Sequence, residues 1–217
     1  MTRDELMWVA GRSTISPLVR AFTPLRNYGV ENVPKKGGLV LAFNHFHWLD
    51  PPVFGSLSPR RIQFMAKIEA HRIPGLGQLI RSFGTIAVRR GESDREAVRL
   101  MREAVRGGGA LGLFAEGTRQ RSGIPGEVQA GAAMSAIQED APVVCAAIHG
   151  TQHWTFGNRY PVSVAWGEPI RFDGLSKNAK GYREGSHEIQ LEIRRLWEFL
   201  VELHELGRPR HATPPPR

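Results

Sequence analysis

The chain has 217 residues, of which 41% are hydrophobic, a formal net charge of +8 at pH 7 and a single cysteine. This length and apolar content suit one α/β domain with a real core, and the lone cysteine excludes a disulfide framework and fits a reducing compartment. The positive charge indicates a phosphate-bearing substrate or an acidic lipid surface; nucleic acid is not favoured, because the chain lacks a dense basic run with interleaved aromatic residues and zinc-finger spacing.

Residues 1–27 predict an amphipathic helical segment, interrupted by glycine and proline. Its apolar positions are Trp8, Ile15, Leu18, Phe22 and Leu25, and its basic positions are Arg3, Arg12, Arg20 and Arg26. This composition predicts binding to an anionic membrane, with packing of the apolar stripe on the core as the alternative. Because we find no signal peptide and no run of about 20 apolar residues, we expect peripheral attachment to the cytoplasmic face of the cell membrane.

Residues 28–206 alternate between strands and helices, which predicts a single α/β domain with a largely parallel sheet covered by helices. Strands are predicted at 39–43, 62–66, 84–88, 111–114, 143–148 and 162–166. Helices are predicted near 51–57, 75–83, 93–106 and 129–139, and along an apolar stripe from Ile189 to Leu203. The Pro-rich tail, residues 207–217, is predicted to be disordered.

A histidine and a carboxylate follow the first buried strand. His45 comes directly after Asn44 at the end of the run 39–43, and Asp50 lies five residues further on. Imidazole titrates close to neutral pH and a carboxylate can hold its tautomer, so this pair can act as a general base. Residues five apart do not meet on a regular helix, so a turn must separate the two if they are partners.

Two other interpretations of these residues remain open. Asp50 precedes Pro51, which is typical of the start of a helix. His45, His47 and Asp50 also form H-x-H-x-x-D, which suits part of a zinc site in a metal-dependent hydrolase. That site needs further ligands, for which the candidates are His149 and His153.

Polar side chains follow four of the predicted strands. These strand ends are Asn44-His45, Arg89-Arg90, Glu116-Gly117-Thr118-Arg119 and His149. Ligands bind at the carboxyl ends of the strands in open α/β sheets. If the strands are parallel, the base, the arginines and a glycine-containing turn converge on one edge.

Four sequence blocks, in this order, resemble the glycerolipid acyltransferase family of the 1-acylglycerol-3-phosphate acyltransferase type. Asn44 to Asp50 matches its N-H-x4-D block, Gly84 to Arg90 its second block, Phe114 to Arg119 is similar to F-P-E-G-T-R, and Ala141 to Val144 resembles the fourth. The resemblance runs from about Gly29 to Ile170 and makes 28–206 an acyltransferase domain. Ala115 stands where proline is usual, which bears on the acceptor more than on the chemistry.

The resemblance implies a role for each block. His45 removes a proton from the attacking hydroxyl and Asp50 orients the imidazole, as in a Ser-His-Asp triad but without the serine. Backbone amides of Gly117 and Thr118 serve the oxyanion. Arg90 and Arg119, with Lys67, hold the acceptor phosphate, and Glu116 fixes the direction of an arginine.

The resemblance also implies the substrates. Acyl-CoA or acyl carrier protein gives a fatty acyl group to a lysophospholipid, with 1-acylglycerol 3-phosphate as the first choice and phosphatidic acid as its product. Glycerol 3-phosphate or another lyso-lipid is the alternative. No metal and no organic cofactor is implied, and Cys145 is expected to be a buried core thiol.

Overall fold

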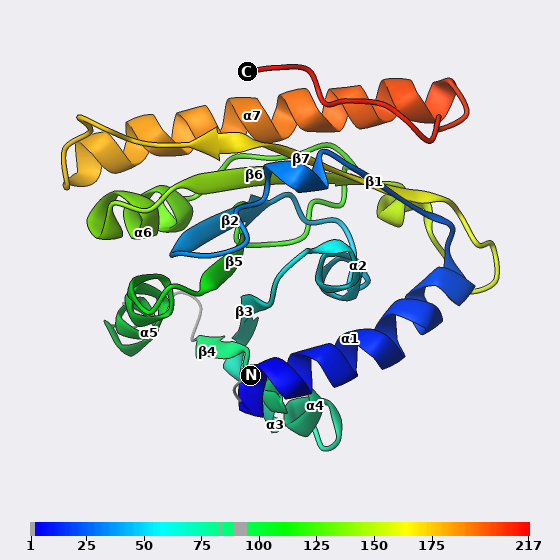
Figure 1. Ribbon diagram of the computed structural model, residues 1–217, viewed down its shortest axis with the longest axis horizontal. Helices are drawn as coiled ribbons and strands as arrows, with labels where there is room; N and C mark the ends of the chain where they lie inside the picture. Colours follow the sequence, from blue (N-terminus) through cyan, green and yellow to red (C-terminus); the bar gives the residue numbers. More distant parts are fainter. Residues whose placement is uncertain (1–2, 83, 89–94) are drawn as a thin grey trace.

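A seven-stranded sheet forms the centre of the molecule (Figure 1). The computed structural model describes residues 3–82, 84–88 and 95–217. In spatial order the strands are β1 (Leu25–Tyr28), β7 (Val162–Ile170), β6 (Val143–His149), β2 (Leu39–Phe43), β5 (Ala110–Phe114), β3 (Ile62–Lys67) and β4 (Ile86–Val88). Neighbouring strands pair in parallel except β6 and β7, which are antiparallel. The largely parallel sheet predicted from the alternating pattern is therefore confirmed.

Helices cover both faces of this sheet (Figure 1). One face packs against α5 (Arg95–Arg106), α6 (Gly131–Glu139) and α7 (Ala179–Glu205), and the other against α1 (Arg3–Phe22) and α2 (Asp50–Leu57). The short helices are α3 (Ile68–Arg72), α4 (Leu76–Ser82) and two 3-10 turns, η1 (Val30–Asn32) and η2 (Thr151–His153). The chain is thus one α/β domain with a separate apolar core on each side of the sheet.

Strand β2 explains why the central strands are apolar throughout. All five of its residues are buried, and their side chains alternate between the two cores. Leu39, Leu41 and Phe43 face the α1 and α2 side, whereas Val40 and Ala42 face α5, α6 and α7. A strand covered on both faces needs a continuous apolar run, which is the pattern that made residues 39–43 recognisable.

The N-terminal segment differs from the expected broken helix. Helix α1 is continuous over 20 residues and contains Pro17. The following residues, Leu25 to Tyr28, are not helical but form β1, which pairs with β7. The helical interpretation of Leu25 was wrong, because a four-residue edge strand is too short to show alternation in sequence. The division between residues 27 and 28 stays a prediction, and β1 lies across it.

The C-terminal tail, predicted to be disordered, runs back along α7 (Figure 1). Tyr28 donates a hydrogen bond to the carbonyl of Pro209 at 2.9 Å, and Arg195 of α7 donates to the carbonyl of Pro215. Ala212 packs against the core. A proline-rich composition disfavours helix and sheet ladders, yet it leaves carbonyl groups free to accept bonds from neighbouring side chains.

Candidate active site

His45 and Asp50 are hydrogen-bonded partners. The Nδ1 atom of His45 lies 2.7 Å from Oδ2 of Asp50, across the turn that joins β2 to α2. The Asp50 side chain is fully buried, whereas that of His45 is 12% exposed. A carboxylate accepts from Nδ1–H, so this contact assigns the proton to Nδ1 and leaves Nε2 free to act as a base.

The same carboxylate oxygen fixes the turn. Asp50 Oδ2 also accepts the backbone N–H groups of Phe46 and His47, at 2.7 and 2.8 Å. These bonds point back into the turn rather than forward into α2, whose N-cap is Leu49. Asp50 is the first residue of α2, so the helix start indicated by Asp50 before Pro51 is confirmed, but its side chain does not cap the helix. One carboxylate oxygen shapes the turn and orients the imidazole.

Two residues of the matched blocks to which the sequence analysis gave no role hold His45 in place. Phe114, the last residue of β5, stacks on the imidazole with ring centroids 4.0 Å apart and an interplanar angle of 25°. The side chain of Asn44 donates to the carbonyl of Ile148 at 3.0 Å and accepts its N–H at 2.8 Å, which ties the end of β2 to β6. The available signals were an asparagine directly after a buried strand and an aromatic residue beside the E-G-T-R block.

Glu116 supports the site through backbone contacts. Its Oε2 accepts the N–H of His45 and its Oε1 that of Gly126, both at 2.8 Å. Burial raises the pKa of Glu116 to about 7, although the two backbone hydrogen bonds act to lower it. Among the described residues Glu116 forms no ion pair with an arginine. Its partners are two backbone N–H groups instead of the arginine that the resemblance implied. Glu116 therefore positions the backbone of His45.

The E-G-T-R loop folds over the carboxyl end of β5. Gly117 has φ +70°, a left-handed conformation that glycine adopts without strain. Its N–H is already used, because it donates to the carbonyl of Phe114 at 2.9 Å. The N–H of Thr118 has no partner within residues 3–82, 84–88 and 95–217. Of the two amides expected to serve an oxyanion, the structure leaves that of Thr118 available.

Of the three basic residues expected to bind the acceptor phosphate, the structure describes the side chain of one. Arg119 is exposed and close to His47, whose pKa is lowered by burial first and by the Arg119 charge as well. Lys67 ends β3, but only its backbone is described. Arg90 lies outside the described residues, and its neighbour in the described part, Val88, ends β4 at the same edge as β3. The edge expected from the strand ends is formed by β2, β5 and β6.

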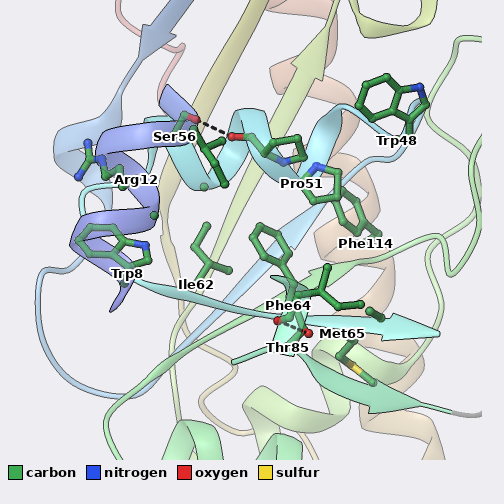
Figure 2. Close-up of a pocket in the computed structure, with 16 residues that line it drawn as sticks. Trp8, Arg12, Trp48, Pro51, Ser56, Ile62, Phe64, Met65, Thr85 and Phe114 are labelled. Carbon is green, nitrogen blue, oxygen red and sulfur yellow. Dashed lines mark hydrogen bonds between the residues drawn. The ribbon is translucent and has the colours of Figure 1, made fainter. Parts of the chain in front are cut away.

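An apolar cavity of about 390 Å³ lies next to His45 and Asp50. It lies between α1, α2 and β3, with Trp8 and Arg12 at one end and Trp48 at the other (Figure 2). Its remaining lining residues are Gly11, Ile15, Pro51, Pro52, Gly55, Ser56, Ile62, Phe64, Met65, Ala66, Ile80, Thr85 and Phe114. Phe114 also stacks on His45, so the imidazole is linked to the cavity wall through one side chain, although neither His45 nor Asp50 lines the cavity itself. Its size is that of a site for a small or chain-like ligand.

The cavity changes the interpretation of the N-terminal segment. Trp8 and Ile15, expected at a membrane surface, line the cavity, and Leu25 is buried in β1. Leu18 and Phe22 are exposed, at 57% and 41%. The apolar stripe of α1 is therefore divided between the interior and the surface. No helix in the described part of the chain is both long and apolar enough to cross a bilayer.

The remaining histidines lie away from His45. His149 contacts Trp197 and His204 of α7, on the other face of the sheet, and is 5.9 Å from His153. Burial lowers the pKa of His149 to about 4. No three His, Cys, Asp or Glu side chains form a potential metal site within the described residues. Cys145 is fully buried, as expected of a core thiol, and burial raises its pKa.

The fold and the site together define an α/β protein with a hydrogen-bonded histidine–aspartate pair next to an apolar cavity. The chain belongs to the Acyltransferase family, whose model matches residues 25–149. The resemblance carried by the four sequence blocks is thereby confirmed, and the family region contains the whole turn from His45 to Asp50.

Individual relatives agree with this assignment. The chain is 29% identical over 124 residues to the 1-acyl-sn-glycerol-3-phosphate acyltransferase of Bacillus subtilis, covering 57% of this chain and 61% of that protein. It is 38% identical over 77 residues to the lyso-ornithine lipid O-acyltransferase of Pseudomonas aeruginosa, covering 35% of this chain and 29% of that protein. The chain thus spans less than two thirds of the length of these curated relatives.

A solved structure has the same fold over most of the chain. The 1-acyl-sn-glycerophosphate acyltransferase PlsC of Thermotoga maritima superposes with a TM-score of 0.71 and is 26% identical in sequence. The match covers 88% of this chain and 79% of that one.

Proposed function

We propose that the protein transfers a fatty acyl group from a thioester, acyl-CoA or acyl carrier protein, to the free hydroxyl of a lysophospholipid. The observation that carries the proposal is the hydrogen bond of 2.7 Å between His45 and Asp50 next to an apolar cavity of about 390 Å³ whose lining residue Phe114 stacks on His45. A general base can activate the acceptor hydroxyl, and an apolar cavity next to it can hold the hydrocarbon chain of the acyl group that the hydroxyl attacks. The preferred acceptor is 1-acylglycerol 3-phosphate, which gives phosphatidic acid.

In this reaction Nε2 of His45 takes the proton from the acceptor hydroxyl as its oxygen attacks the thioester carbonyl. Asp50, already bonded to Nδ1, stabilises the imidazolium that forms. When the tetrahedral intermediate collapses, the carbon–sulfur bond breaks and the imidazolium returns the proton to the departing thiolate. The acceptor oxygen is the nucleophile, so no acyl-enzyme forms.

The loop after β5 serves the developing negative charge. The N–H of Thr118 is the proposed oxyanion donor, because the N–H of Gly117 is engaged by the carbonyl of Phe114. Arg119 is the proposed ligand of the acceptor phosphate, since its planar guanidinium can bond two oxygens at once. Arg90 and Lys67 are assigned to the same phosphate from the matched family blocks.

The cavity is assigned to the acyl chain that is transferred. The carbonyl under attack must lie beside His45, and Phe114 joins that imidazole to the cavity wall. A chain that starts at the carbonyl therefore extends directly into the apolar space. The acceptor, a lipid, is supplied from an anionic membrane that the protein contacts peripherally, on its cytoplasmic face, through the exposed Leu18 and Phe22 of α1.

A thioester-release assay with a panel of acceptors tests the proposal. Palmitoyl-CoA and palmitoyl carrier protein are offered with 1-acylglycerol 3-phosphate, glycerol 3-phosphate and lyso-ornithine lipid; the last is included because of the Pseudomonas aeruginosa relative. We expect release with 1-acylglycerol 3-phosphate in wild type and none in His45→Ala. Absence of acceptor-dependent release, or hydrolysis that requires an added divalent metal, would overturn the proposal and favour the hydrolase alternative.

A further inference from the structure

An exposed aromatic surface borders the candidate active site. Phe156 is 84% exposed and is the most exposed large apolar side chain in the described part of the molecule. Its ring lies 5.9 Å from that of Phe22, and Trp48, 59% exposed, lies 5.7 Å from Trp154. Trp154 is itself buried, and it donates its indole N–H to the carbonyl of Phe22, which joins the two pairs from beneath. We call Phe22, Trp48, Trp154 and Phe156 the aromatic rim.

The rim is next to the reacting pair. His47 is two residues from His45. The centroid of its imidazole lies 5.2 Å from the ring centroid of Trp48 and 5.5 Å from that of Trp154. Trp48 also lines the outer end of the apolar cavity (Figure 2). The rim and the cavity therefore share Trp48, so a surface that covers the rim also covers this end of the cavity.

The loop that carries Phe156 is held in shape by its own hydrogen bonds. The Asn158 carboxamide accepts the backbone N–H groups of Thr155 and Tyr160, at 3.1 and 3.0 Å, and donates to the carbonyl of His153 at 2.8 Å. Polar backbone groups without partners strongly oppose entry into an apolar phase. This loop satisfies several of them internally and presents a phenyl ring at its tip, which lowers the cost of leaving water.

The charge around the rim has one sign. The segments that carry the rim and the adjoining site are 18–22, 45–52, 117–126 and 151–161. They contain four arginines, namely Arg20, Arg119, Arg121 and Arg159. Their only acidic residue is Asp50, which is fully buried. Aromatic side chains on segments that also carry arginines complement an anionic lipid surface.

We propose that the aromatic rim is a lipid-docking surface, in which Phe156 inserts into an anionic bilayer and seats the cavity entrance at the headgroup level. The loop 154–160 is thus a membrane-binding element separate from α1. The inference rests on the proposed function for the identity of the acceptor, but the docking itself requires no turnover.

The test measures insertion and binding directly. Cys145, the only cysteine, is fully buried, so Phe156→Cys in the full chain can be labelled selectively with an environment-sensitive fluorophore. Leu191→Cys is the matched control, because Leu191 is 55% exposed on α7, which covers the opposite face of the sheet. Vesicles of phosphatidylcholine with phosphatidylglycerol, and of phosphatidylcholine alone, are added, and doxyl-labelled lipids report the depth of the label.

We expect a blue shift and doxyl quenching at position 156 with anionic vesicles, and neither at position 191. In co-sedimentation, Phe156→Ala should lower the partition coefficient about tenfold, the loss expected for one inserted aromatic side chain, whereas Leu191→Ala should leave it unchanged. A label at 156 that stays in water while the protein binds vesicles would overturn the proposal, as would a wild type that does not bind. Burial of the label by dimerisation without lipid, detected by light scattering, would assign the rim to a second copy of the chain instead.

The two proposals fail separately. Rim-dependent binding without thioester release would remove the proposed function and leave the docking surface. If Phe156→Ala releases thioester and binds vesicles as well as the wild type does, the docking surface is removed and the proposed function stands.

Discussion

Replacing Gly55 by leucine should shorten the acyl chain that the protein accepts. Gly55 lies in α2 and lines the cavity, and a Cβ atom built there meets no other atom within 4 Å. A leucine side chain therefore extends into the cavity without displacing backbone. It occupies the space of about four methylene groups, which a long acyl chain then has to give up.

The size of the effect follows from burial. Each buried methylene contributes about 0.8 kcal/mol, so excluding roughly four from the cavity costs a long chain about 3 kcal/mol. A short chain that ends before Gly55 loses nothing. Because about 1.4 kcal/mol corresponds to a factor of ten, the ratio of kcat/KM for palmitoyl-CoA over octanoyl-CoA should fall roughly a hundredfold.

The assay is thioester release over a series of donor lengths at a fixed acceptor concentration. Gly55→Ala is the control: it adds only the Cβ atom, should keep the length preference, and should raise the unfolding free energy by about 0.5–1 kcal/mol by removing a glycine from a helix. If Gly55→Leu is folded and still prefers palmitoyl-CoA as the wild type does, the cavity does not hold the transferred chain.

Three further outcomes follow from the site. His45→Ala should lower kcat by about 10² to 10⁴ with an unchanged melting temperature, whereas His47→Ala should retain most activity; the opposite ranking in the thioester assay would reassign the base. Arg119→Ala should raise the KM of the acceptor but not of the thioester, by a factor that corresponds to about 1.5–3 kcal/mol, and Arg194→Ala on the exposed face of α7 should raise neither. Glu116 has a pKa raised from 4.5 to about 7 in the folded protein, so its protonated form favours folding, and this contribution is lost as pH rises from 4.5 through 7. In urea titrations the unfolding free energy of the wild type should fall by roughly 3 kcal/mol across that pH window, and that of Glu116→Gln should not. If both proteins lose the same unfolding free energy between pH 4.5 and 7, the raised pKa is contradicted.

The central strands and the hydrogen-bonded pair of His45 and Asp50 were predictable because their signals are local. The run 39–43 forms β2 with the predicted bounds, and His45 and Asp50 meet across a turn, as their spacing required. Four polar strand ends implied a common edge once the strands were assumed parallel. These conclusions need only the period of apolar residues and the rule that parallel strands end together.

The features that depend on packing between distant segments were not predictable. The sequence does not show that Trp8 faces a cavity rather than a membrane, because both positions favour the same apolar side chain. It does not show that Glu116 accepts the N–H of His45, 71 positions earlier in the chain, since a carboxylate beside arginines equally suggests an ion pair. The strand β1 is recognisable only from its register with β7.

The reversed direction of β7 determines where the N-terminal helix enters. His149 at the end of β6 lies opposite Ser163 at the start of β7, and Leu25 at the start of β1 lies opposite Val162. The first residue of β1 is therefore at the edge where β2 and β6 finish, and α1 arrives there at Phe22. Had β1 run in the same direction as β2, α1 would have ended on the far side of the sheet. Topology alone thus brings the end of α1, the loop after η2 and His45 to one side of the molecule, so under the proposed function an acceptor at the aromatic rim would have no protein layer to cross before it reached His45.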